Sequence, residues 1–300
     1  MVKEIFFSWQ FLAVFSTLVW AVINIIDKHV ISERIKQARV ATIFTGISSI
    51  IIVAILSFFT TITIPDFFLL LITVFGGILW IIAVVFYYKA LQVEEVSRVI
   101  PIFLLDPIFT AVLAAIFLGE IFSTTIYGGI VFVVLGAILI SLKKTETLHF
   151  GKSLWLILTS TLLISIDGII LKFVLKEVDF LSVFFWGRVG AIIGVIPIFL
   201  LYNKQFLQTI KQKTKISAIL LGTDLISGAT GIIFTLAIAL GPVTLVSAIT
   251  ATLPLFVFIL ATIISLLKPE ILREETGKTS IAVKLAAIII MIVGSYLALV

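Results

Sequence analysis

The chain of 300 residues is 61% hydrophobic and only 12% charged, and its formal net charge is +5. Soluble domains are typically about 45–50% apolar and about 25% charged, so this composition excludes a soluble enzyme, a disordered protein and an ordinary nucleic-acid-binding protein. The absence of Cys excludes disulfides and thiolate zinc sites. Two His residues are few for a histidine metal cluster, and we expect neither a cofactor nor a metal.

Ten apolar runs, taken in chain order, predict ten transmembrane helices. A helix needs about 20 mostly apolar residues to cross a hydrocarbon core about 30 Å thick. The runs cover residues 8–27, 40–60, 67–88, 98–118, 123–142, 153–172, 180–201, 216–239, 243–266 and 280–299. Alternation typical of a β-barrel is absent, and lipid admits only helices or closed barrels. The predicted fold is therefore an all-α integral membrane protein.

The sequence contains signs of an internal duplication. Ser16-Thr17-Leu18 recurs as Ser160-Thr161-Leu162, and Ala90-Leu91 before Pro107 recurs as Ala239-Leu240 before Pro254. These matches divide the chain into residues 1–145, with helices 1 to 5, and residues 146–300, with helices 6 to 10. Because five is odd, the second half must enter the membrane from the opposite side. The sequence thus predicts an inverted repeat, with a binding site near the midplane between the halves.

The motifs in each half resemble those of a known family. Ala90-Leu91, Pro107 and Leu118-Gly119-Glu120 resemble the third and fourth helices of an EamA-type domain of the drug/metabolite transporter superfamily. The second half is similar, with Ala239-Leu240, Ser247, Pro254 and Pro269-Glu270. The resemblance implies a carrier for small metabolites or drugs, often an exporter, with a central cavity between the two repeats.

The second helix of each repeat differs between the halves. Phe185-Trp186-Gly187-Arg188 looks like the start of the second helix of an EamA repeat, which often carries an Arg. In the first half, Phe44 stands at the position of that Arg. From its own position within a predicted span, we expect Arg188 to pair with a carboxylate such as Asp179 or to guard the mouth of a cavity.

The distribution of positive charge predicts an orientation. All Lys and Arg residues except Lys3, Lys172, Lys176 and Arg188 flank the loops that follow helices 1, 3, 5, 7 and 9. The positive-inside rule places these loops in the cytoplasm and both termini outside. The family resemblance implies cytoplasmic termini instead, so the two arguments predict opposite orientations in the plasma membrane.

Three acidic residues lie within predicted spans and are the first candidates for function. A charged group in hydrocarbon costs about 2.5–3.5 kcal/mol on insertion scales, so Asp106, Asp167 and Asp224 are expected to face a cavity or a partner. A desolvated carboxylate has a raised pKa and can bind a proton in one conformation and release it in another. The alternative for each is a structural Asp that is hydrogen-bonded to a neighbouring helix.

Polar and aromatic residues at helical spacing predict which helix faces line the cavity. Such residues avoid lipid and prefer helix contacts or a wet interior. The alternative is ordinary helix packing. The candidates are Trp20 and Asn24 on helix 1, Trp80 and Tyr87 on helix 3, Ser227 and Thr235 on helix 8, and Ser247 on helix 9.

Proline residues within helices 4 and 9 predict matching kinks. Pro107 and Pro254 each remove one backbone hydrogen bond and clash with the carbonyl four residues before. A kink near the midplane frees a carbonyl for a ligand or provides a bend for gating, whereas a fixed kink only improves packing. Glu120, which closes helix 4, is interpreted as a solvated residue at a helix end.

Together these features predict a secondary transporter that exports small metabolites or drugs by alternating access. Its expected partners are a small-molecule substrate, protons, the lipid bilayer and a second copy in a homodimer, without nucleic acid. A channel and a non-transporting membrane protein are alternatives, and an intramembrane enzyme is a weaker one because no metal-ligand or nucleophile motif occurs. The few cations within the predicted spans disfavour multiply charged phosphates as substrates.

Overall fold

The computed structural model describes residues 8–33, 38–93, 102–141, 152–267 and 278–299, and all regular structure in these residues is helical. The prediction of an all-α chain is confirmed. The helices of the described part are α2 (Trp9–Glu33), α3 (Ala38–Phe59), α4 (Phe67–Val93), α6 (Asp106–Phe117), α7 (Thr124–Ser141), α8 (Lys152–Val174), α9 (Phe180–Gln212), α10 (Thr214–Leu240), α11 (Val243–Thr250), α12 (Leu253–Leu267) and α13 (Lys278–Leu299).

Within the described residues, seven helical segments are long and apolar enough to cross a membrane, and one of them combines α11 and α12. Three shorter apolar helices lie at Asp106–Phe117, Thr124–Leu139 and Ala286–Ala298. Each of the ten predicted runs coincides with at least one helix. The largest difference is at residues 98–118, where α6 begins only at Asp106. At 1.5 Å per residue, α6 is about 18 Å long, which is shorter than the hydrocarbon core.

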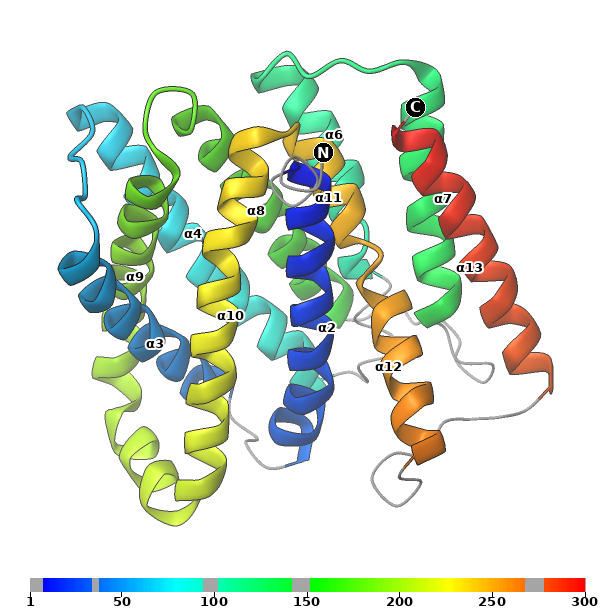
Figure 1. Cartoon of the computed structure of the whole chain (residues 1–300). Coiled ribbons are helices and arrows are strands. Elements are labelled where there is room, and N and C mark those ends of the chain that lie inside the picture. The colour runs from blue at the N-terminus through cyan, green and yellow to red at the C-terminus, as the bar shows by residue number, and fades with distance from the viewer. Residues whose placement is uncertain (1–7, 34–37, 94–101, 142–151, 268–277, 300) are drawn as a thin grey trace.

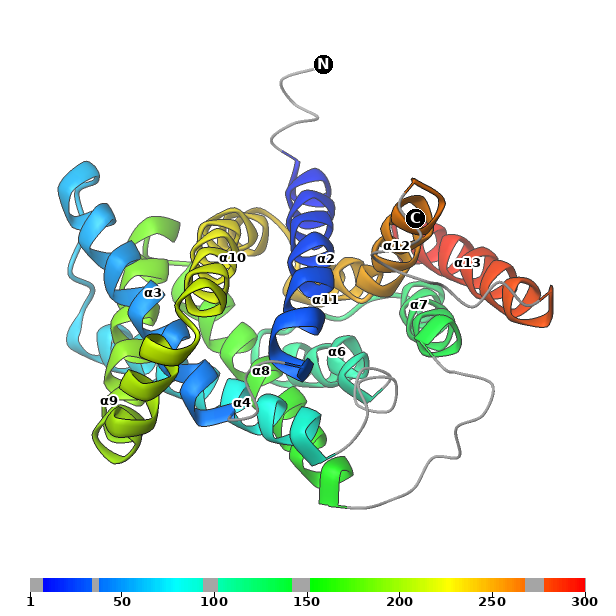
Figure 2. The same ribbon diagram turned by 90° about the horizontal axis from the view of Figure 1, so that it is seen from below.

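The helices form one bundle with a separate pair at its edge (Figure 1). In the main part, α4 packs against α8 and α9, α2 packs against α10, and α3 packs against α9. Helices α7 and α13 pack against each other at one side, as the view from below also shows (Figure 2). Helix α2 begins and α13 ends at the same end of the bundle (Figure 1).

The α7–α13 pair depends on a close approach of the two backbones. A Cβ atom added to Gly129 would lie 2.5 Å from the amide nitrogen of Ala298 and 2.7 Å from the carbonyl oxygen of Gly294. A Cβ atom at Gly294 would in turn lie 2.6 Å from the nitrogen of Val133. Small residues let helices approach in this way where no hydrophobic effect drives their association. This contact holds the two helices together at the edge of the bundle.

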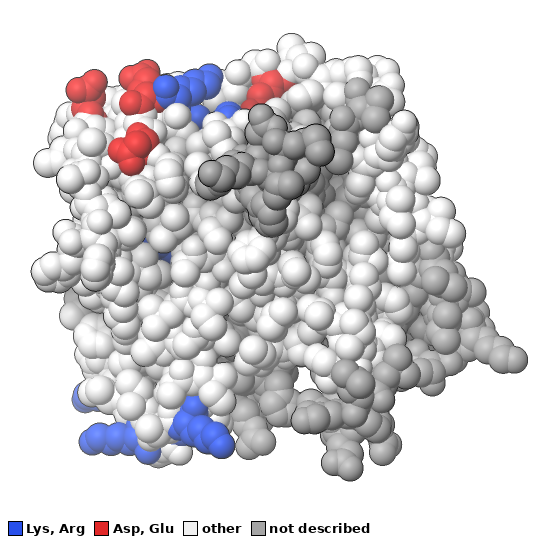
Figure 3. Space-filling view, viewed as in Figure 1, with Lys and Arg blue, Asp and Glu red and all other residues white. Residues whose placement is uncertain are grey.

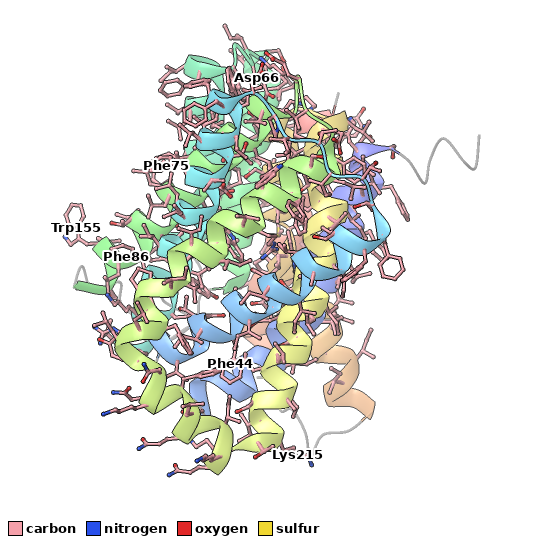
Figure 4. All side chains as sticks on the ribbon, turned by 90° about the vertical axis from the view of Figure 1, so that its left-hand side faces the viewer. Phe44, Asp66, Phe75, Phe86, Trp155 and Lys215 are labelled. Carbon is pink, nitrogen blue, oxygen red and sulfur yellow. The ribbon has the colours of Figure 1, made fainter. Side chains whose placement is uncertain are left out.

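The described charged residues lie mainly at the two ends of the bundle, with an uncharged surface between them (Figure 3). Lys204, Lys211, Lys213 and Lys215 are exposed around the α9–α10 connection. The opposite end carries acidic and basic residues together. Figure 4 shows Asp66 and Lys215 at these opposite ends. This distribution is typical of a protein whose middle faces lipid.

Helix α9 extends beyond its predicted span, which covered residues 180–201. Its 33 residues include Pro197, and the backbone leaves the helical conformation at Tyr202 (φ −121°, ψ 15°). A proline lacks the N–H for one hydrogen bond and disturbs the preceding turn, so a kink near it is expected. The part of α9 after Tyr202 carries the exposed Lys204 and Lys211.

Candidate functional site

Three charged side chains from consecutive helices meet inside the bundle. Arg188 of α9 interacts electrostatically with Asp224 of α10 and with Asp167 of α8. All three side chains are half-buried. Asp167 is the sixteenth residue of α8 and lies about 22 Å from the start of that helix, at 1.5 Å per residue. We call Asp167, Arg188 and Asp224 the charged cluster.

Aromatic rings hold the guanidinium group of the charged cluster. The Arg188 Cζ atom lies 4.6 Å from the centroid of the Trp80 ring and 4.8 Å from that of Phe184. A guanidinium stacked on aromatic faces gains cation–π attraction, which increases when water is excluded. A Cβ atom added to Gly231 would lie 3.1 Å from an Arg188 nitrogen, so α10 also passes close to it. Arg188 is therefore enclosed by α4, α9 and α10.

The two carboxylates of the cluster have different surroundings. Thr45 of α3 donates a hydrogen bond from Oγ1 to Asp224 Oδ2 at 3.4 Å. Asp167 lies against α4, where a Cβ atom added to Gly76 would lie 2.8 Å from Asp167 Oδ1. The glycine thus leaves room for the Asp167 carboxylate at the surface of α4.

Asp106 forms a second polar site, on the other side of α8. Ser165 of α8 donates from Oγ to Asp106 Oδ1 at 2.6 Å, and Ser247 of α11 donates to Asp106 Oδ2. Thr110, one turn further along α6, is 3.4 Å from Oδ1. Asp106 therefore connects α6, α8 and α11. We call Asp106, Ser165 and Ser247 the Asp106 junction.

At the two predicted kinks, Pro107 and Pro254, a short turn precedes the first residue of a helix. Pro107 is the second residue of α6, and Pro254 is the second residue of α12, after the turn at Ala251 and Thr252 that separates α11 from α12. Proline is well tolerated in the first turn of a helix because the N–H that it lacks has no partner there. Both side chains are buried.

Glu120 is not a simple solvated residue at a helix end. Its carboxylate accepts hydrogen bonds from the backbone nitrogens of Val243 and Thr244 at 3.1 and 3.3 Å, and from Thr244 Oγ1 at 3.0 Å. It thereby caps the first turn of α11 from another part of the chain. Gly119 makes this possible because its φ of +69°, which glycine adopts without strain, turns the chain directly after α6.

Lys172 lies close to Glu120, where α10 ends and α11 begins. Its Nζ atom donates to the carbonyl oxygens of Ile238 and Gly241, each at 2.8 Å, at the end of α10. A cation is stabilised at the C-terminal end of a helix, and an anion is stabilised at the N-terminal end. Lys172 and Glu120 also attract each other. We call Glu120, Lys172 and Thr244 the α10–α11 corner.

The carboxylates that act on Arg188 are Asp224 and Asp167, which corrects the expected pairing with Asp179. Its Oδ1 accepts the backbone N–H of Ser182 at 3.0 Å and so caps α9, and its Oδ2 accepts the Thr63 hydroxyl at 2.9 Å. Partial burial raises the pKa of the Asp179 carboxyl, but the hydrogen bonds from Ser182, Thr63 and the backbone of Leu181 outweigh it, so the pKa lies below its ordinary value.

The remaining predicted site residues do not join one site. The ring centroids of Trp20 and Phe234 are 5.0 Å apart, and Tyr87 packs against Tyr88 and Phe103. Asn24 and Thr235 donate to carbonyls of their own helices, at Trp20 and Gly231. Ser227 is half-buried. Of the predicted stripe residues, Trp80 contacts Arg188 of the charged cluster, and Ser247 belongs to the Asp106 junction.

Some residues of these sites carried a signal in the sequence, and others did not. Arg188 could be recognised from the sequence because it is a cation within a predicted span, but its partners could not be predicted. Ser165, Thr45 and Phe184 gave no signal because serine, threonine and phenylalanine are common on any packed helix face. Pro269 and Glu270 lie outside the described residues. Among the described residues, no three His, Asp or Glu side chains gather where they could hold a metal ion.

Comparisons with known proteins relate this chain to a solved structure and to one protein family. No curated protein matches the sequence. Among solved structures, a chain described only as "Crystal structure of protein" is similar in fold, with a TM-score of 0.68 and 13% sequence identity over 97% of this chain and 94% of that chain. The model of the EamA-like transporter family matches residues 7–142. The segment of residues 7–142 is therefore similar to the EamA-like transporter family.

Proposed function

We propose that the protein is a secondary transporter that exports small metabolites or drugs by alternating access between two inverted five-helix repeats. The repeats are residues 1–145 and 146–300. Helices α2, α3, α4, α6 and α7 would correspond in order to α8, α9, α10, α11 with α12, and α13. The whole chain would then cross the membrane ten times.

The pattern of helix contacts supports this correspondence. Exchanging the two halves converts the α2–α10 contact into the α8–α4 contact, and the α3–α10 contact into the α9–α4 contact. The α3–α9, α6–α11 and α7–α13 contacts are each converted into themselves, because both members of each pair are counterparts. A pattern that survives this exchange is expected from a pseudo-twofold axis passing through these three pairs.

The observation that carries the proposal is the Asp106 junction at the contact between the halves. Asp106 belongs to the first half, whereas Ser165 and Ser247 belong to the second. Ionisable groups inside a membrane bundle mark substrate pathways or proton relays. Protonation of Asp106 would change the strength of this connection, because a neutral carboxyl accepts weaker hydrogen bonds than a carboxylate. We therefore assign energy coupling by protons to Asp106, with Asp224 as a second candidate.

Transport in proteoliposomes tests the proposal. Protein in vesicles is given a panel of labelled amino acids, amines and aromatic acids, with and without a pH gradient. We expect accumulation of some of these solutes, driven by the gradient. Asp106→Asn should abolish the response to the gradient, whereas Asp66→Asn, an exposed residue at the end of the bundle, should transport as wild type does. Gradient-driven transport that survives Asp106→Asn would refute the coupling role.

Orientation and assembly are part of the same proposal. We place the lysine-rich end around the α9–α10 connection in the cytoplasm of a cell with the protein in its plasma membrane. A reporter that functions only in the cytoplasm, fused to either terminus, should then be inactive. An active reporter would reverse the orientation and agree with the expectation from the family. A homodimer is proposed as well, and light scattering of the purified protein measures it.

Rapid and unsaturable ion flux in a bilayer recording would favour a channel over this carrier.

A further inference from the structure

We propose that the end of α9 and the start of α10 bind phospholipids with anionic headgroups through a surface of exposed cations. The surface consists of Arg39, Lys204, Lys211, Lys213 and Lys215, and we call it the basic surface. The proposal goes beyond the proposed function, because it concerns the lipid around the protein and not the solute that crosses it. It is carried by the depth of these residues, by exposed leucines beside the lysines and by the lack of acidic residues in this part of the sequence.

The bend of α9 at Tyr202 coincides with the depth at which the hydrocarbon core is expected to end. The part of α9 before the bend, residues 180–201, is about 33 Å long at 1.5 Å per residue, close to the core thickness of about 30 Å. Tyrosine is favoured at this boundary because its ring is apolar and its hydroxyl group is polar. The exposed Arg39 lies over the Tyr202 ring, with its Cζ atom 4.7 Å from the ring centroid. The basic surface therefore begins where the headgroups of the lipid begin.

The segment after the bend has one face toward the protein and one face toward its surroundings. Phe206 is buried, and its ring centroid lies 5.0 Å from that of Phe44 of α3. The opposite face carries Lys204, Leu207 and Lys211 at the i, i+3 and i+7 spacing of one helix stripe, and all three are exposed. Because the other face is packed, these lysines lie on a fixed surface.

Exposed leucines beside the lysines distinguish a surface for lipid from a surface in water. Leu200, Leu201 and Leu207 are 66, 74 and 52% exposed. The charges at the end of a membrane bundle need only stay outside the hydrocarbon, whereas exposed leucines are stabilised when an apolar partner covers them. A phospholipid supplies both an acyl chain and a charged phosphate. The leucines and lysines of this stripe therefore fit one lipid molecule better than water alone.

The sequence around these lysines contains no acidic residues. Between Arg188 and Asp224 there is no Asp or Glu, and this stretch holds four of the five cations of the basic surface. On the face seen in Figure 3, the described charged residues at this end are Lys and Arg, without Asp or Glu. A cluster of about four to eight Lys or Arg residues next to a transmembrane helix is typical of proteins that bind acidic lipids. The basic surface thus favours an anionic headgroup over a zwitterionic one.

The exposure of the cations favours a lipid over a soluble phosphate compound. Water and salt screen the attraction between exposed lysines and a free anion. The acyl chains of a lipid hold its phosphate at the membrane surface, so the local concentration of phosphate beside the lysines is high. The leucines have no counterpart in a small soluble phosphate.

Native mass spectrometry of the purified full chain in detergent tests the proposal with two lipids that share the same acyl chains, dioleoylphosphatidylglycerol and dioleoylphosphatidylcholine. We expect the anionic lipid to bind about tenfold more tightly, with a preference that shrinks as the salt concentration rises. Replacing the four lysines of the basic surface together by Gln should remove this preference, whereas replacing the same four by Arg should retain it. Lys176→Gln, which changes an exposed lysine at the opposite end of the bundle, should bind as wild type does.

Equal binding of the two lipids by the wild type would overturn the proposal, and this comparison does not depend on the folding of any variant. A preference that persists in the variant with four Gln residues would overturn it as well. Glycerol 3-phosphate carries the phosphate without acyl chains, so displacement of the anionic lipid by an equal concentration of this compound would assign the surface to soluble phosphates instead. None of these measurements needs a solute to cross a membrane, so failure of this proposal leaves the transport function in place, and failure of transport leaves this proposal in place.

Discussion

Replacement of Glu120 should destabilise the protein through the α10–α11 corner. Glu120→Ala removes three hydrogen bonds that the carboxylate accepts from Val243 and Thr244. A hydrogen bond to a charged group contributes about 1.5–3 kcal/mol, and loss of a helix cap costs about 0.5–2 kcal/mol. Because Glu120 is only half-buried, water replaces part of this loss. We therefore expect a loss of about 2–3 kcal/mol.

The assay is thermal unfolding in detergent micelles, followed by tryptophan fluorescence. A change of 1 kcal/mol shifts Tm by about 2–4 °C in chains of 150–250 residues, so we expect Glu120→Ala to lower Tm by about 5–10 °C. Glu120→Gln retains one acceptor oxygen and should lower it by roughly half as much. Glu177→Gln is the matched control, because Glu177 is exposed at the same end of the bundle. A Glu120→Ala protein that melts within 1 °C of the wild type, by the same scale, would refute this account of the corner.

Two further predictions concern charged residues. Arg188→Ala should lower the free energy of unfolding by about 3–5 kcal/mol because it removes the guanidinium group that interacts with both Asp167 and Asp224. In the same melting assay, adding Asp224→Asn to Arg188→Ala should recover part of this loss. If the losses of the two single variants simply add in the double variant, the pairing is contradicted. Asp179→Asn should lower Tm at pH 7. The folded pKa of Asp179 is below its ordinary value, so its stabilising contribution is complete above the unfolded pKa of about 3.9 and is lost as the pH falls through the folded value. The Tm difference between wild type and Asp179→Asn should therefore narrow between about pH 5 and pH 3, and a constant difference would exclude this role.

The helices were predictable from the sequence because hydropathy reports directly on which segments can face lipid. The first and last residues of the helices were less predictable where an effect other than hydropathy determines them. Helix α9 continues to Gln212 because a helix can extend from lipid into water, where lysines replace apolar residues. Helix α6 begins at Asp106, followed by Pro107, because the proline favours the first turn of a helix over its interior.

The candidate site was only partly predictable because contacts between helices depend on their rotation and depth. Asp106, Asp167 and Asp224 could be recognised singly as acids within spans, but not sorted into two sites on different sides of α8. Arg188 was expected to pair with a carboxylate such as Asp179 or to guard the mouth of a cavity, whereas its partners Asp167 and Asp224 come from other helices. Asn24 and Thr235 followed the expected stripes, yet they satisfy their polar groups within their own helices.

The turn between α11 and α12 has a practical consequence for handling the protein. Around Ala251 and Thr252 the regular helical ladder is interrupted, and Pro254 supplies no N–H group. Non-helical backbone is tolerated inside a membrane only where protein or water, and not acyl chains, surrounds it. Small detergents that wedge between α11 and α6 would expose this stretch to hydrocarbon, so bulky or lipid-like amphiphiles should preserve activity longest during purification.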